Sequence, residues 1–245
     1  MARETLTLEE VAAYLHLELR HVERLVKEGQ IPHVRRGERF LFVRSDIDAW
    51  ASQRLLGLPD EGLDWYHRRT MPGAKVAFAD AALMPVLVKP EFIDLELAAR
   101  TRASALAEMA ALGGRTGRVL DVKALQASLE EREEMSSTAL PGGFALLHPH
   151  RQEAYVFEGS LVALGRTVQG IHFGAPDHRP TRLFFLVCCA DAPIHLHVLA
   201  RLSLLALRTD LIPRLWEVPT PAEAFDLLVS AERSVLPDAG QVAFR

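Results

Sequence analysis

Four histidines occur as two His-x-His pairs, and an imidazole can serve as a nucleophile or as a metal ligand. His148 and His150 flank a proline in the stretch GGFALLHPH, directly after a glycine pair and a short apolar run. His195 and His197 lie in the stretch CCADAPIHLHVLARL. A neutral imidazole is nucleophilic near pH 7, and four of them would also suit zinc. The elements that position the histidines decide between these two chemistries.

The zinc interpretation requires the imidazoles to converge. Side chains two positions apart on a helix diverge by about 200°, so His195 and His197 cannot bind one ion together from a helix. Pro149 also disfavours regular strand geometry for the first pair. We therefore predict no metal site and no cofactor.

The second pair follows a strand. The continuous apolar run RLFFLVCCA predicts a strand buried on both faces. Asp191 can cap the helix that follows, Pro193 suits its first turn, and His195 comes within that turn. The unpaired N–H groups and dipole at a helix N-terminus favour an anion, so His195 is placed to meet a phosphate.

From Val88 onwards the pattern alternates between helix and strand. Strands are predicted over GSLVALGRT and RLFFLVCCA. Helices are predicted over ELAARTRASALAEMAALGG, ending at its glycine pair, and over VKALQASLEEREE, LHVLARLSLLALR and PAEAFDLLVSAERSV. This pattern indicates a layered α/β domain over residues 88–237, with a tail at 238–245.

The stretches EREEMSSTALPGGFALLHPHR and CCADAPIHLHVLARLSLL resemble the type 2 enzyme IIA domains of the bacterial phosphotransferase system. These include the fructose, mannitol and nitrogen-regulatory IIA domains. The resemblance covers about residues 88–236, where VKPEFIDLELAARTRASALAEM is similar to the family's first helix. Arg132, Thr138, GGFALLH with His148, and HLHVLARLS from His195 fill the family motif in order. The resemblance implies a layered α/β fold with a mixed sheet.

The resemblance also implies residue roles. His148 would accept a phosphoryl group from an HPr-type phosphocarrier protein or its nitrogen-branch counterpart. His195 matches the histidine that hydrogen-bonds this group, and Arg132 the arginine that helps to neutralise it. Thr138 and Gly143 are the expected phosphate-binding residues.

The family proline before the active histidine is Leu147 here, which puts onward transfer of the phosphate in question. An alternative alignment would place Pro149–His150 on the family's Pro–His. We prefer His148, because GFALLH fits without a gap. The remaining histidines are expected to be structural: His150, His172, His178 and His197.

Residues 5–56 indicate a compact helical unit with the order helix, turn, helix, hairpin, helix. Thr7 and Glu10 form a capping box before VAAYL, and Ser45 with Asp48 is expected to cap the third helix. The stretches LTLEEVAAYL and HVERLVKEGQIPHVRRGERFLFVRSDIDAWA resemble the excisionase-type, MerR-related helix-turn-helix family. The expected domain is a small winged helix over residues 1–57 that binds double-stranded DNA.

The expected DNA contacts come from the second helix and from the hairpin wing. They are Arg20, His21, Arg24, Lys27, Arg35, Arg36 and Arg39. Residues 1–57 hold nine basic and nine acidic side chains, so binding by one copy should be weak and a homodimer is expected. The alternatives are that these side chains form an ordinary solvated surface or that the module binds protein.

The whole chain has a net charge of −4, which gives no general affinity for nucleic acid. Its two cysteines are adjacent in an apolar run, and its apolar runs are too short to span a bilayer. The stretch MARETLTLEE lacks the apolar core expected of a signal peptide. We therefore expect a cytoplasmic protein without a membrane partner. Residues 58–87 are expected to be a linker, with one short helix over EGLDWYHRR.

Taken together, the sequence predicts a cytoplasmic DNA-binding regulator with a phosphoacceptor domain. One alternative is a IIA component that relays phosphate while its N-terminal module binds protein. Another is a IIA-like interaction protein that is not phosphorylated. If the two halves are coupled, the coupling should act through docking, because salt screens a phosphate charge beyond about 8 Å.

Overall fold

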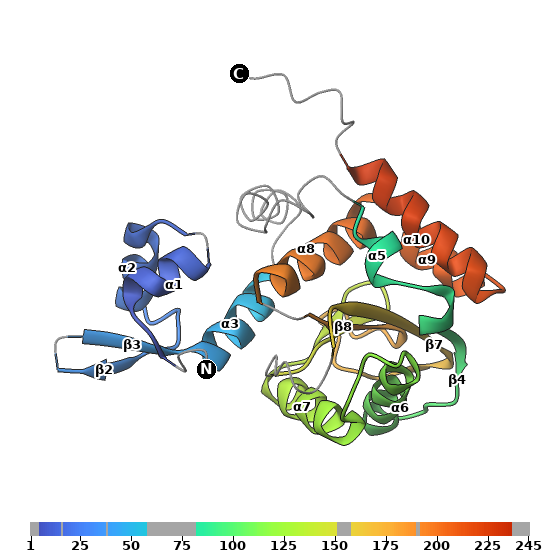
Figure 1. Cartoon of the computed structure of the whole chain (residues 1–245), viewed down its shortest axis with the longest axis horizontal. Helices are drawn as coiled ribbons and strands as arrows, with labels where there is room; N and C mark the ends of the chain where they lie inside the picture. Colours follow the sequence, from blue (N-terminus) through green and yellow to red (C-terminus); the bar gives the residue numbers. More distant parts are fainter. Residues whose placement is uncertain are drawn as a thin grey trace, which may run out of the picture.

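A computed structural model shows an N-terminal winged-helix domain and a C-terminal α/β domain (Figure 1). It describes residues 5–15, 17–37, 39–57, 82–150, 158–189 and 192–236. The expected helix over EGLDWYHRR, the Asp191 cap and the tail at 238–245 lie outside these residues. Within the described ranges, every helix is too short or too polar to cross a membrane.

The N-terminal domain has the expected element order, with one additional short strand. Its elements are β1 (Thr5–Leu6), α1 (Leu8–Tyr14), α2 (Leu19–Lys27), β2 (Val34–Arg36), β3 (Arg39–Val43) and α3 (Arg44–Leu56). The strands form an antiparallel sheet in the order β1-β3-β2. The capping box at α1 is present: Glu10 N–H donates to Thr7 Oγ1 at 3.2 Å, and Thr7 N–H donates to the Glu10 carboxylate at 2.8 Å.

The prediction that Ser45 and Asp48 cap α3 is wrong. Strand β3 runs directly into the helix at Arg44, so Ser45 already lies inside the first turn. The Ser45 hydroxyl donates to Asp46, and the Asp48 carboxylate accepts a hydrogen bond from the Tyr14 hydroxyl. Asp48 therefore ties α3 to α1 instead of closing the end of its own helix.

The C-terminal domain is built on a five-stranded sheet in the order β4-β7-β8-β6-β5. Its strands are β4 (Ile93–Leu97), β5 (Ala139–Leu140), β6 (Phe144–Leu147), β7 (Leu161–Ile171) and β8 (Thr181–Cys188). The pairs β4–β7 and β6–β8 are parallel, whereas β7–β8 and β5–β6 are antiparallel. The sheet is therefore mixed, as the resemblance implied.

Helices cover both faces of this sheet (Figure 1). One face carries α6 (Arg102–Arg115) and α7 (Val122–Met135). The other carries α5 (Met84–Leu87), α8 (Ala192–Arg208), α9 (Leu211–Glu217) and α10 (Pro221–Val235), and a 3-10 turn (η2, Pro90–Phe92) precedes β4. In β8, Phe185 belongs to the hydrophobic cluster with α8, whereas its neighbour Phe184 belongs to the cluster with α6. A strand buried on both faces explains the continuous apolar run.

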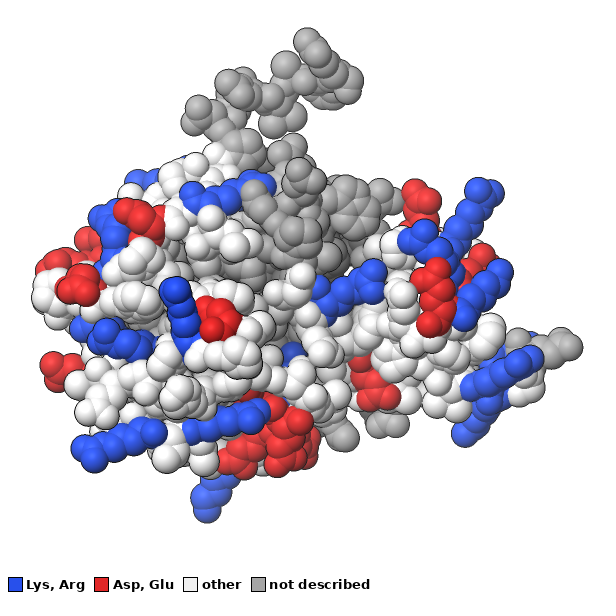
Figure 2. All heavy atoms as spheres, turned by 180° about the vertical axis from the view of Figure 1, so that it is seen from behind, with Lys and Arg blue, Asp and Glu red and all other residues white. Residues whose placement is uncertain are grey.

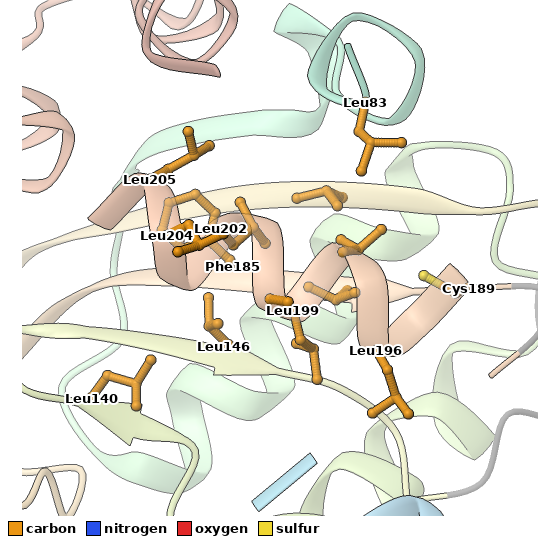
Figure 3. Close-up of a cluster of buried hydrophobic side chains, with 14 of the residues drawn as sticks. Leu83, Leu140, Leu146, Phe185, Cys189, Leu196, Leu199, Leu202, Leu204 and Leu205 are labelled. Atoms are coloured by element: carbon orange, nitrogen blue, oxygen red, sulfur yellow. The ribbon is translucent and has the colours of Figure 1, made fainter. Parts of the chain in front are cut away.

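Helix α8 packs leucines on the sheet, and Figure 3 shows Leu199 and Leu202 beside Leu146 and Phe185. The N-terminal end of the same helix packs against α3 (Figure 1). As a result, one hydrophobic cluster runs from the N-terminal domain into the C-terminal domain.

Two expectations about the C-terminal domain need correction. The helix expected over ELAARTRASALAEMAALGG begins only at Arg102, because its first residues complete β4. Its glycine pair does not end it. A Cβ atom at Gly114 would lie 2.6 Å from Val122 Cγ2, so this glycine allows α6 and α7 to approach closely.

The end of the expected 58–87 linker is part of the folded domain. Leu83 and Met84 are fully buried, and their backbone N–H groups donate to the Glu232 carboxylate at 2.9 and 2.8 Å. Glu232 also pairs with buried Arg201 at 2.7 Å. The sequence assigned residues 83–87 to a linker because so short an apolar segment has no visible period.

Candidate functional site

One histidine of each pair, His148 and His195, lies at the same edge of the sheet. His148 directly follows β6, and His195 lies in the first turn of α8, which comes after β8. Because β6 and β8 are parallel neighbours, their carboxyl ends share one edge. The ring centroids of His148 and His195 are 4.9 Å apart.

Arg132 joins them from the last turn of α7. Its Nε–H donates to His148 Nε2 at 2.9 Å, and its Nη1 donates to the Ser136 carbonyl at 3.0 Å. All three predicted residues are 2% exposed or less. The structure therefore places His148, His195 and Arg132 together, as expected from the sequence.

These contacts set the tautomer of His148. Its Nδ1 lies 2.8 Å from the Leu146 carbonyl, an acceptor, so Nδ1 carries the proton. Its Nε2 accepts from Arg132 and therefore holds the lone pair. Of the two ring nitrogens of His148, Nε2 is therefore the one with a lone pair, and a guanidinium lies beside it.

Burial keeps both imidazoles neutral. Desolvation, and then the charges of Arg132 and His195, lower the pKa of His148 well below its ordinary value. Desolvation and Arg132 lower the pKa of His195 to about 3. Neutral rings suit a nucleophile and a hydrogen-bond donor at pH 7.

This burial predicts a pH dependence of stability. Between pH 6.5 and about 3 the unfolded chain protonates His195 and the folded chain does not, so the free energy of unfolding falls as the pH falls. At pH 5.5 this loss is about 1.4 kcal/mol relative to neutral pH. In His195→Gln, urea unfolding at pH 7.5 and 5.5 should show a loss smaller by about this amount. An equal loss of stability in the wild type and in His195→Gln would show that His195 has the same pKa in the folded and the unfolded chain.

The pocket around the histidines is closed by the N-terminal domain. Within its described lining it is too narrow for a water molecule. Three lining residues come from α3: Asp48, Ala49 and Ser52. The Ser52 hydroxyl donates to the Asp48 carbonyl at 2.8 Å. Its oxygen therefore accepts from His195 Nε2–H at 3.3 Å.

The sequence did not indicate these α3 residues as part of the site. They are small or polar residues in an ordinary amphipathic helix, and nothing in their spacing points to a partner in another domain. No sequence signal marks them, and only the structure shows that Ala49 and Ser52 are 6% and 0% exposed.

Thr138 and Gly143 are not among the residues that line this pocket. The Thr138 hydroxyl donates to Glu133 at 2.6 Å, which positions the start of β5. Gly143 lies directly before β6, at the opposite end of the strand from His148, and packs against Trp216 and Pro180. A phosphate-binding role for these two residues stays a prediction.

The other histidines occupy different surroundings. His150 lines the same pocket, and its backbone N–H donates to the Ser128 carbonyl at 3.1 Å. His197 is buried in α8, where desolvation and Arg201 lower its pKa to about 4. Among the described residues, no group of three histidine, cysteine or acidic side chains is arranged to hold a metal ion.

The predicted DNA contacts lie on the surface of the N-terminal domain. His21 is half-buried. The other six are exposed: Arg20, Arg24, Lys27, Arg35, Arg36 and Arg39. Those of α2 lie opposite its buried residues Val22, Leu25 and Val26. Figure 2 shows basic side chains projecting from this domain, with acidic ones between them.

Comparisons with known families match both halves of the chain. The family model described as "Phosphoenolpyruvate-dependent sugar phosphotransferase system, EIIA 2" matches residues 86–231. A helix-turn-helix domain model matches residues 5–55.

Curated proteins match the C-terminal half. A fructose-specific EIIA component of Haloferax volcanii is 33% identical over 140 residues, which is 56% of this chain and 89% of that protein. A fructose-specific EIIABC component of Bacillus subtilis is 26% identical over 144 residues. That match covers 58% of this chain and only 22% of the Bacillus protein.

Solved structures match the same half. The nitrogen regulatory protein IIA-Ntr of Neisseria meningitidis has a TM-score of 0.54 and 25% identity, over 60% of this chain and 99% of that one. The mannitol IIA of Escherichia coli has a TM-score of 0.51 and 21% identity, over 58% and 98%. The second likeness concerns the fold alone.

Proposed function

Because the chain belongs to the EIIA 2 family of the phosphoenolpyruvate-dependent sugar phosphotransferase system, we propose that His148 accepts a phosphoryl group from an HPr-type phosphocarrier. The helix-turn-helix domain makes the whole chain a DNA-binding regulator in this proposal. The observation that carries the phosphoacceptor role is the 2.9 Å contact between Arg132 Nε and His148 Nε2. This contact places a cation beside the ring nitrogen of His148 that holds a lone pair.

The transfer balances without a cofactor. The lone pair of His148 Nε2 attacks the phosphorus of the carrier's phosphohistidine. The N–P bond of the carrier breaks, and its electron pair returns to the carrier imidazole. Arg132 then donates to the phosphoryl oxygens, and the Leu146 carbonyl accepts from Nδ1–H of the cationic ring.

Incubation with phosphoenolpyruvate, enzyme I and an HPr-type carrier tests the proposal. The intact mass of the full chain should increase by one phosphoryl group. The modification should be labile in acid and stable in base, as a phosphoramidate is. No increase in mass after prolonged incubation would reject the phosphoacceptor role.

DNA binding predicts a specific effect of the wing. Arg36 is exposed at the end of β2, so Arg36→Glu should remove a phosphate contact. Affinity should fall for all DNA sequences, and the slope of log K against log salt should decrease by at least one unit, following the rule of roughly one unit per contact. Fluorescence anisotropy at several salt concentrations measures both.

Arg179→Glu is the matched control, because Arg179 is an exposed arginine of the C-terminal domain. It should leave DNA affinity unchanged. Equal affinities for Arg36→Glu and the wild type would remove the wing from the DNA interface. The proposal also includes a homodimer on DNA, since residues 1–57 are neutral overall.

A further inference from the structure

The proposed phosphoacceptor is covered by the domain that is proposed to bind DNA. Helix α3 contributes Asp48, Ala49 and Ser52 to the pocket that contains His148 and His195. Both imidazoles are only 2% exposed. An acceptor must come into bonding contact with a phosphohistidine that is itself carried on a protein. With α3 in this position, such contact is sterically excluded.

The pocket is also too small for the product. A phosphoryl group brings three oxygens that need hydrogen bonds, and the pocket is too narrow even for one water molecule. An open groove of about 270 Å³ lies next to it, between α3 and the end of α7. This groove is lined by Arg132 but not by the histidines. The groove therefore borders the guanidinium side of the site and not the nucleophile, while Arg132 itself is only 1% exposed.

Ser52 already accepts the hydrogen bond that His195 would have to donate to the phosphoryl group. His195 Nε2–H donates to Ser52 Oγ at 3.3 Å. By the resemblance of the C-terminal domain to type 2 IIA domains, this imidazole should hydrogen-bond the phosphoryl group on His148. It cannot give the same proton to both partners, so the serine and the phosphoryl group exclude each other.

We propose that α3 is a cap over His148, and that a phosphoryl donor and α3 compete for the same surface of the C-terminal domain. The proposal rests on His148 being the acceptor. The cap leaves before the carrier docks, and the phosphorylated site cannot rebind α3 in the same way. Phosphorylation of His148 thereby releases the winged-helix domain from the C-terminal domain.

The part of α3 that faces the pocket is small and polar. Ala49 and Ser52 line the pocket together with Arg132 and His148 of the C-terminal domain, so the facing domain contributes to their burial. The DNA contacts proposed for α2 and the wing lie outside the pocket and stay exposed while α3 is docked. Release can therefore change the position of the winged helix without dismantling its DNA-binding surface.

The substitution Ala49→Trp tests the cap in the full chain. The indole cannot fit into the pocket, so α3 should stay undocked while the N-terminal core is untouched. The initial rate of phosphorylation by the carrier should increase at least about tenfold, as expected if fewer than one molecule in ten is open in the wild type. Arg54→Trp is the matched control, because Arg54 is exposed on the same helix and does not line the pocket. It should react at the wild-type rate.

The outcomes separate the cap from the proposed function. If no variant is phosphorylated, the phosphoacceptor role fails. If all three proteins are phosphorylated equally fast, His148 is an acceptor and the cap is wrong.

Hydrogen exchange of the wild type decides independently, in case Ala49→Trp does not fold. Peptides covering 44–56 should exchange faster after phosphorylation, and those of His148→Ala in the same mixture should not. Unchanged exchange in the phosphorylated protein would overturn the cap.

Discussion

Alanine in place of His148 should abolish phosphorylation by the carrier system. His148 Nε2 is the nitrogen that holds the lone pair beside Arg132, and alanine offers no nucleophile in its place. The expected result is a complete loss of acid-labile phosphate, measured by intact mass after saturating incubation.

His150→Ala is the matched control for this experiment. His150 lines the same pocket two residues further along the chain, and it represents the alternative alignment with the family's Pro–His. This variant should still acquire one phosphoryl group. Phosphorylation of His148→Ala together with loss in His150→Ala would show that the acceptor had been assigned to the wrong histidine.

Glu232→Gln should lower the free energy of unfolding by about 3–5 kcal/mol. Glu232 and Arg201 are 0% and 1% exposed, so removing the carboxylate charge leaves a buried guanidinium without its counter-ion. The same carboxylate accepts from the N–H groups of Leu83 and Met84. The NH₂ group of the glutamine would face one of these N–H groups, and two donors cannot form a hydrogen bond with each other. Urea unfolding measures the difference.

Asp226→Asn provides the comparison, since Asp226 is an exposed acidic residue of the same helix. Its effect should stay within about 0.5 kcal/mol. The double variant Glu232→Gln with Arg201→Met should recover most of the lost stability, because the buried guanidinium is removed together with its carboxylate partner. A similar loss in the double and single variants would show that the hydrogen bonds to residues 83 and 84 matter more than the ion pair.

Local patterns in the sequence were sufficient for most of the elements. The capping box at Thr7, the apolar run of β8 and the amphipathic face of α10 depend on neighbours a few residues away, and each has the expected structure. The failures came where contacts with distant elements decide. The glycine pair at 113–114 continues α6 because α7 packs against it, and residues 83–87 fold because Glu232 binds them.

The candidate site divides in the same way. The order of the motifs, the place of His195 at the start of α8, and the two family likenesses were determined by the sequence alone. Only the tertiary structure decided that Ser52 and Ala49 close the pocket over His148. A hydrophobic pattern specifies which face of a helix is buried, but it does not specify what buries it. The contact between α3 and α8 joins residues far apart in the chain, so it emerges only when both domains have folded and packed together.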